Sequence, residues 1–181
     1  YRYGNRYQLG LFPQSIEDYV AKDDPVRAYD AFVEALDFSA LGIEIDPNQV
    51  GNSEYDPKAM LKLLVYGYSY GIKSSRKLER ETHHNISFIW LMGGLKPDHK
   101  TIAEFRRNNK GALKRTLKQC ARLCIKLDLI AGNILFVDGA KIRANASRSQ
   151  THDQAYYEQL LLEVDGRIEQ LLEECEGIDQ Q

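Results

Sequence analysis

The sequence predicts a mainly α-helical protein, and three observations support this. Apolar side chains recur at three- and four-residue spacing along most of the chain as far as about residue 130. Helix-capping residues stand directly before several of these apolar stripes. Only one short segment, beginning at Asn133, has the composition of β-strands. We therefore expect a multi-helix domain that contains a helix-turn-helix-like unit, followed by a short β-hairpin and a C-terminal amphipathic helix.

The helices are expected wherever a capping residue precedes an apolar stripe. An aspartate followed by proline opens two of them, at Asp24-Pro25 and Asp56-Pro57, because aspartate caps free N–H groups and proline suits the first helical position. The second of these helices is apolar on nearly all sides, which is typical of a helix at the centre of its domain. The expected helices span residues 15–20, 26–36, 60–70, 76–83, 86–92, 99–107, 113–127 and 154–175, with a loop at 42–55 and a break at 108–111.

The β-prone segment divides the chain. Residues 134–137 read Ile-Leu-Phe-Val, Asp138-Gly139 is a hairpin signal, and residues 140–144 alternate as a second strand would. We predict a helical domain over residues 1–130 and the beginning of a second domain over residues 131–181 that includes the acidic final helix.

The net charge of −2 conceals a strong asymmetry. Residues 58–126 hold sixteen Lys or Arg against four Asp or Glu, whereas residues 1–57 hold four against eleven and residues 151–181 one against nine. A basic block between acidic flanks indicates a face that binds a polyanion, with nucleic acid the leading candidate. The alternative reading is an ordinary solvated helix surface.

The basic block coincides with several short helices between Ser74 and Asn109, which have the ingredients of a helix-turn-helix. Arg and Lys are the side chains best suited to phosphates and guanine edges. The candidate DNA-binding residues in this unit are Arg76, Lys77, Arg80, Lys96, His99, Lys100, Arg106 and Arg107, of which we expect the last two to point outward. Lys114 and Arg115 join them from the next helix. The stripe of Arg115, Lys118, Arg122 and Lys126 fits a phosphate backbone, but the solvated-face reading is favoured there.

Other features are interpreted as structural. Cys120 and Cys124 lie four residues apart in a helical pattern and are expected to be small core residues. His83 and His84 would point about 100° apart on a helix, which disfavours one shared metal ion. No apolar run approaches the roughly 18 residues of a membrane span. We therefore expect no membrane partner. The DNA-binding interpretation adds the expectation of a cytoplasmic, nucleoid-associated location.

Asp138 is the most specific chemical candidate. An aspartate at the end of a buried strand presents a carboxylate at the edge of a sheet, and metal-dependent phosphoryl transfer uses such carboxylates to hold two Mg²⁺ ions about 4 Å apart. The same Val-Asp-Gly sequence is also a common hairpin turn, so the residues alone leave both readings open.

Six ordered motifs carry a resemblance to a known family. They are YDPKAMLKLL at 55–64, YGY at 66–68, GIKSSRKLE at 71–79, FIWLMGGLKPDHKTI at 88–102, FRR at 105–107 and VDGAKIRANAS at 137–147. With these motifs the chain resembles the N-terminal half of bacterial insertion-sequence transposases with an Asp-Asp-Glu active site. Ala140 departs from the threonine more usual in such families, while the neighbouring carboxylate is retained.

The resemblance implies both a partner and a chemistry. The partner is double-stranded DNA at terminal inverted repeats, and the full-length protein is expected to act as a homo-oligomer. Asp138 would be the first catalytic carboxylate and a Mg²⁺ ligand on the first strand of an RNase-H-like fold, with Lys141 and Arg143 near phosphates. The second Asp and the Glu would lie beyond Gln181, so we expect a fragment that binds DNA without cutting or joining it and holds no Mg²⁺ by itself. The alternatives are a DNA-binding regulator with no catalytic role and a helical oligomerisation module built on residues 154–175.

Overall fold

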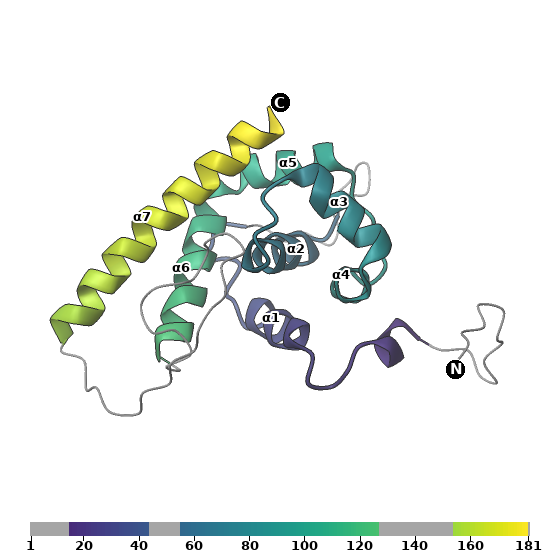
Figure 1. Ribbon diagram of the computed structural model, residues 1–181, viewed down its shortest axis with the longest axis horizontal. Helices are drawn as coiled ribbons and strands as arrows, with labels where there is room; N and C mark the ends of the chain where they lie inside the picture. Colours follow the sequence, from purple (N-terminus) through teal and green to yellow (C-terminus); the bar gives the residue numbers. More distant parts are fainter. Residues whose placement is uncertain (1–14, 44–54, 127–153, 181) are drawn as a thin grey trace, which may run out of the picture.

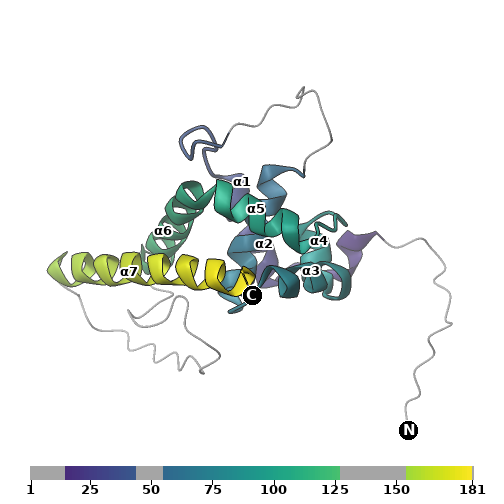
Figure 2. The same ribbon diagram turned by 90° about the horizontal axis from the view of Figure 1, so that it is seen from above.

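The computed structural model describes residues 15–43, 55–126 and 154–180 (Figures 1 and 2). Within these ranges the chain is mainly α-helical, as predicted, with one 3-10 helix and no strand. The expected hairpin lies outside the described residues. The elements are η1 (Ile16–Tyr19), α1 (Pro25–Glu34), α2 (Pro57–Ser69), α3 (Ser75–His84), α4 (Ile86–Leu91), α5 (His99–Asn108), α6 (Lys110–Lys126) and α7 (Gln154–Asp179).

Side-chain capping explains where α1 and α2 begin. The side chain of Asp24 accepts a hydrogen bond from Val26 N, and that of Asp56 accepts one from Lys58 N, both at 2.9 Å. Both Asp-Pro starts are thus confirmed. The expected break at 108–111 is wrong, because only Asn109 separates α5 from α6. Gly111 lies in the first turn of α6 and does not interrupt the helix.

Helix α2 is the centre of the domain, and α1, α3, α4, α5 and α6 all contact it (Figure 1). Leu61, Leu63 and Leu64 are fully buried within it. The prediction that this all-round apolar helix is central is confirmed. A helix that is buried on several faces needs a neighbour on each face, and the surrounding helices are these neighbours of α2.

Gly67 lies where α2 packs tightly against Leu78 of α3. A Cβ atom added there would lie 2.3 Å from Cδ2 of Leu78, which is itself fully buried. By contrast, a Cβ added at Gly166 in α7 would meet nothing within 4 Å.

These two glycines predict opposite effects of one substitution. We expect Gly67→Ala to lower the free energy of unfolding by about 1–2 kcal/mol, because overpacking outweighs the gain in helix propensity. Gly166→Ala should raise it by about 0.5–1 kcal/mol, since only the propensity gain remains. Urea unfolding followed by circular dichroism measures both, and equal stabilisation by the two changes would contradict the tight α2–α3 contact.

Helix α7 packs along α6, and its C-terminal end reaches α5 and α3 (Figures 1 and 2). Its buried side chains Ile168, Leu171, Leu172 and Cys175 belong to the same hydrophobic cluster as Leu113 and Leu117 of α6. The sequence pattern places this helix in the second domain. The domain boundary stays a prediction, but the described part of residues 131–181 shares a core with helices α1 to α6.

Candidate nucleic-acid interface

Helices α3 and α5 pack against each other and carry most of the predicted DNA-binding residues. Nδ1 of His99, at the start of α5, lies 2.8 Å from Oε2 of Glu79 on α3. Asp98 caps α5 by accepting a hydrogen bond from Thr101 N at 2.7 Å, which lowers the pKa of the Asp98 carboxyl. His99 therefore joins the two helices, and its partner is a glutamate of the same unit.

The other candidates on this unit mostly face solvent. Exposed side chains on α3, on α5 and on the segment between α4 and α5 are Arg76, Lys77, Arg80, Lys96, Lys100 and Arg107. Arg80 approaches Glu81 at 4.0 Å, and its side chain is 66% exposed. None of the other five forms an ion pair with a residue in the described ranges. These side chains are therefore available to an external anion.

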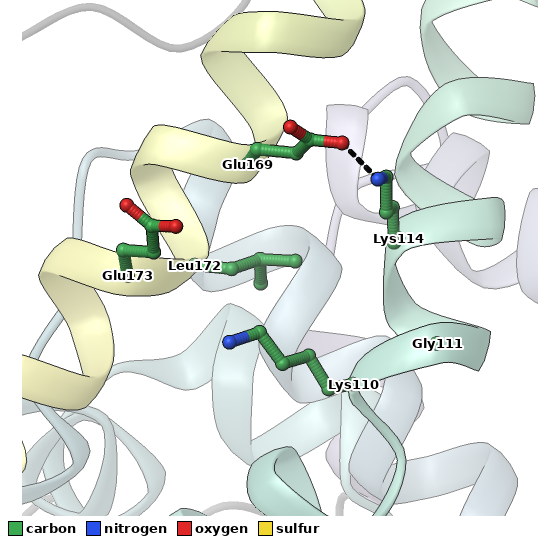
Figure 3. A pocket seen from close by; sticks show the side chains of 6 residues that line it. All are labelled: Lys110, Gly111, Lys114, Glu169, Leu172 and Glu173. Carbon is green, nitrogen blue, oxygen red and sulfur yellow. Dashed lines mark hydrogen bonds and ion pairs between the residues drawn. The ribbon is translucent and has the colours of Figure 1, made fainter.

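The lysines of α6 differ, because carboxylates of α7 face them. Lys110 Nζ lies 2.9 Å from Glu176 Oε1, and Lys118 Nζ lies 2.6 Å from Asp165 Oδ2. Between them, Lys114 pairs with Glu169, and this contact lowers the pKa of the Glu169 carboxyl (Figure 3). The acidic helix thus neutralises three regularly spaced lysines of α6.

A cleft of about 390 Å³ lies between these two helices (Figure 3). It is lined by Lys110, Gly111, Lys114, Glu169, Leu172 and Glu173. Its two lysines already have carboxylate partners. The mixed charges give this cleft no clear preference for an anion or a cation.

Arg106 is buried, so its expected outward orientation is wrong. It is 1% exposed, and its Nη1 donates to Asp179 Oδ2 at 2.8 Å and to the carbonyl oxygen of Cys175 at 3.2 Å. Its guanidinium also lies over the ring of Tyr68, 5.6 Å from the centroid. The physical reason is helical spacing: position 106 follows the fully buried Ile102 by four residues and therefore faces the same side of α5.

Arg115 is exposed overall, but its guanidinium is engaged within the chain. Its Nη2 donates to the carbonyl oxygen of Leu41, which ties α6 to the segment after α1. The partner is a backbone carbonyl 74 positions away, so the sequence around Arg115 could not predict this contact.

Two residues at this site were not predicted. Ser75, the first residue of α3, donates from its backbone N to Asp179 Oδ1 at 2.9 Å and from its Oγ to Asp179 Oδ2 at 2.5 Å. Asp179 is the last residue of α7 and is separated from Ser75 by 104 positions. No local signal could have revealed a contact of this separation.

The predicted catalytic and metal-binding residue Asp138, with Lys141 and Arg143, lies outside the described residues. In the described ranges, no three His, Cys, Asp or Glu residues are grouped so that they could hold a metal ion.

Cys120, expected to be a core residue, is indeed buried, and Cys124 is half-buried. Across the helices that the structure describes, none combines the length and apolarity needed to cross a membrane.

Comparison with known proteins identifies the class. Residues 14–108 match the family described as Transposase domain (DUF772). The match runs from η1 through α5 and covers just over half of the 181 residues, so the chain belongs to this transposase-domain family. Neither the curated proteins nor the solved structures that were compared gave a match. The transposase part of the predicted resemblance is therefore confirmed, for a region that includes α3 and α5.

Proposed function

We propose that this domain binds duplex DNA through α3 and α5, as the part of a transposase that recognises the ends of a mobile element. The observation that carries the proposal is the distribution of cations with no carboxylate partner. Five of these cations, Arg76, Lys77, Lys96, Lys100 and Arg107, lie on α3, on α5 or on the segment before α5, inside the region that matches the transposase-domain family. By contrast, Lys110, Lys114 and Lys118 of α6 are neutralised by α7.

The arrangement suits contacts to the phosphate backbone. Proteins position themselves on DNA mainly through Arg and Lys contacts to phosphates, and these contacts carry most of the non-specific affinity. Arg76, Lys77 and Arg80 are all exposed on one helix, and Lys100 and Arg107 are exposed on its packing partner. In this proposal α3, α4 and α5 form a helix-turn-helix-like unit, with one helix entering the major groove and another crossing the backbone.

The finer parts of the proposal concern the complete enzyme. Asp138 would be a ligand for catalytic Mg²⁺ in a nuclease domain of the Asp-Asp-Glu class, with Lys141 and Arg143 near the reacting phosphates. Strand transfer would then take place in a homo-oligomer bound to both element ends. These roles rest on the family resemblance of residues 137–147.

The proposal predicts which cations matter for DNA affinity. We expect the double variant Arg76→Gln, Lys77→Gln to weaken binding to duplex DNA. It should also reduce the steepness of log K against log salt concentration by about two, one for each phosphate that the variant no longer neutralises. Fluorescence anisotropy with a labelled duplex, from about 50 to 200 mM salt, measures affinity and slope together.

The matched control is Lys114→Gln, Lys118→Gln, which changes the net charge equally. These lysines already pair with Glu169 and Asp165, so affinity and slope should change little. Equal effects of the two double variants would mean that net charge alone governs binding and would contradict the assignment to α3. Absence of binding at the lowest salt would overturn the DNA-binding proposal.

A further inference from the structure

The N-terminus of α3 binds a carboxylate of the same chain, that of Asp179. Three donors converge on the Asp179 carboxylate: the backbone N and the Oγ of Ser75, at 2.9 and 2.5 Å, and Nη1 of Arg106, at 2.8 Å. The preceding residue, Ser74, makes no side-chain capping bond. A helix N-terminus carries partial positive charge and free N–H groups, so it favours a negatively charged partner.

Arg106 provides a second, independent observation. It is 1% exposed, yet its Nε and Nη2 have no hydrogen-bond partner in the described parts of the chain. A buried donor without a partner is costly. Both oxygens of the Asp179 carboxylate are already used by the three donors, whereas a phosphate would bring additional acceptor oxygens to the same place.

Access to this place requires movement of only the last turn of α7. Asp179 is the final residue of that helix, and its side chain is 13% exposed. The preceding turns are held by Cys175 and Leu172, which are 0% and 1% exposed. Helix ends fray far more readily than buried turns detach. The carboxylate can therefore leave while the α6–α7 seam stays packed.

We propose that the N-terminus of α3, together with Ser75 and Arg106, is a phosphate-binding site that Asp179 occupies in the free protein and that a DNA backbone phosphate takes over on binding. The inference rests on the proposed DNA-binding function and deepens it. Arg76 and Lys77, exposed in the first turn of α3, lie next to the site along the chain and attract the incoming phosphate. Asp179 acts as an internal competitor of DNA.

The test replaces Asp179 with asparagine, which removes the competing charge and keeps the shape. Thermal unfolding is followed by circular dichroism with inorganic phosphate or with chloride at equal ionic strength. We expect phosphate to raise the Tm of Asp179→Asn and to leave the wild type unchanged. In DNA anisotropy the variant should bind more tightly than the wild type, because the DNA phosphate no longer has to displace a competing carboxylate.

Asp165→Asn is the matched control, because it removes the same charge from the same helix at a residue paired with Lys118. It should show neither the phosphate effect nor the gain in DNA affinity. If Asp179→Asn is unfolded in chloride, refolding by phosphate supports the site, and failure of phosphate to refold it overturns the proposal.

Two further outcomes separate the sources of phosphate. Stabilisation by inorganic phosphate without a gain in DNA affinity would support a small-anion site and overturn its assignment to DNA. If Asp179→Asn is folded but gains neither stability from inorganic phosphate nor affinity for DNA, the proposed phosphate site is overturned. The phosphate measurement uses no DNA, so its failure is distinguishable from failure of the Arg76 and Lys77 experiment on the wild-type background.

Discussion

Replacing Arg106 with alanine is expected to lower the free energy of unfolding by about 3–5 kcal/mol, the range found when one partner of a buried ion pair is removed. The guanidinium is 1% exposed and joins three elements: it donates to Asp179 and to the Cys175 carbonyl of α7, and it lies over Tyr68 of α2. Alanine would remove these interactions and leave the Asp179 carboxylate with only Ser75 as a partner.

Urea unfolding followed by circular dichroism measures this destabilisation. The neighbouring Arg107→Ala provides the control, because that side chain is exposed and surface substitutions usually change stability by no more than about 0.5 kcal/mol. Similar costs for the two variants would show that Arg106 is not the buried link between α5 and α7. Arg107→Ala should instead weaken DNA binding in the anisotropy assay. Of these two adjacent arginines, we therefore expect Arg106 to determine stability and Arg107 to contribute to DNA affinity.

Replacing Leu172 with alanine is expected to cost about 2–5 kcal/mol of unfolding free energy. Leu172 is 1% exposed in the seam between α7 and α6, where Leu113 and Leu117 belong to the same core. Truncation would leave a cavity in that seam. Leu162→Ala on the same helix is the control, since this side chain is 72% exposed and should contribute little.

The same experiment shows whether α7 folds with the rest of the helices. The single tryptophan, Trp90, lies in α4, which is not among the helices that α7 mainly contacts, so its fluorescence reports on the α1–α4 side of the domain. Circular dichroism reports on all helices, α7 included. We expect the two transitions to coincide in the wild type, as for one cooperative unit. A separate early loss of helix without a change in Trp90 fluorescence would show that α7 is an independent element.

Much of the helical architecture could be predicted from the sequence, because helix starts are local events. Asp24, Asp56 and Asp98 each accept a hydrogen bond from a backbone N two or three residues later, so each cap is visible within a few letters. The apolar surroundings of α2 likewise indicated its central place. The family could also be recognised, because its motifs lie in order along the chain and the match to the transposase domain includes most of them.

The candidate site was predictable only in part. The sequence located the basic block and a helix-turn-helix-like unit within residues 74–109. Four of the candidates in that unit, Arg76, Lys77, Lys100 and Arg107, are exposed. The sequence did not distinguish these cations from Lys114, which pairs with Glu169 across 55 positions. The number of Lys and Arg residues in a segment can be counted from the sequence. Whether each of them can bind an external anion depends on whether a carboxylate packs beside it in the fold.

The sequence by itself therefore determined the helices, the basic block and the family, all of which depend on residues that are close together along the chain. The tertiary structure decided which cations face solvent, which three lysines of α6 are neutralised by α7, and which carboxylate Arg106 meets. The physical reason is that ion pairs and buried contacts form between side chains brought together by the packing of the shared apolar core. Asp179 meets Arg106 across 73 positions because Leu172 and Cys175 seat α7 against α6 and α5.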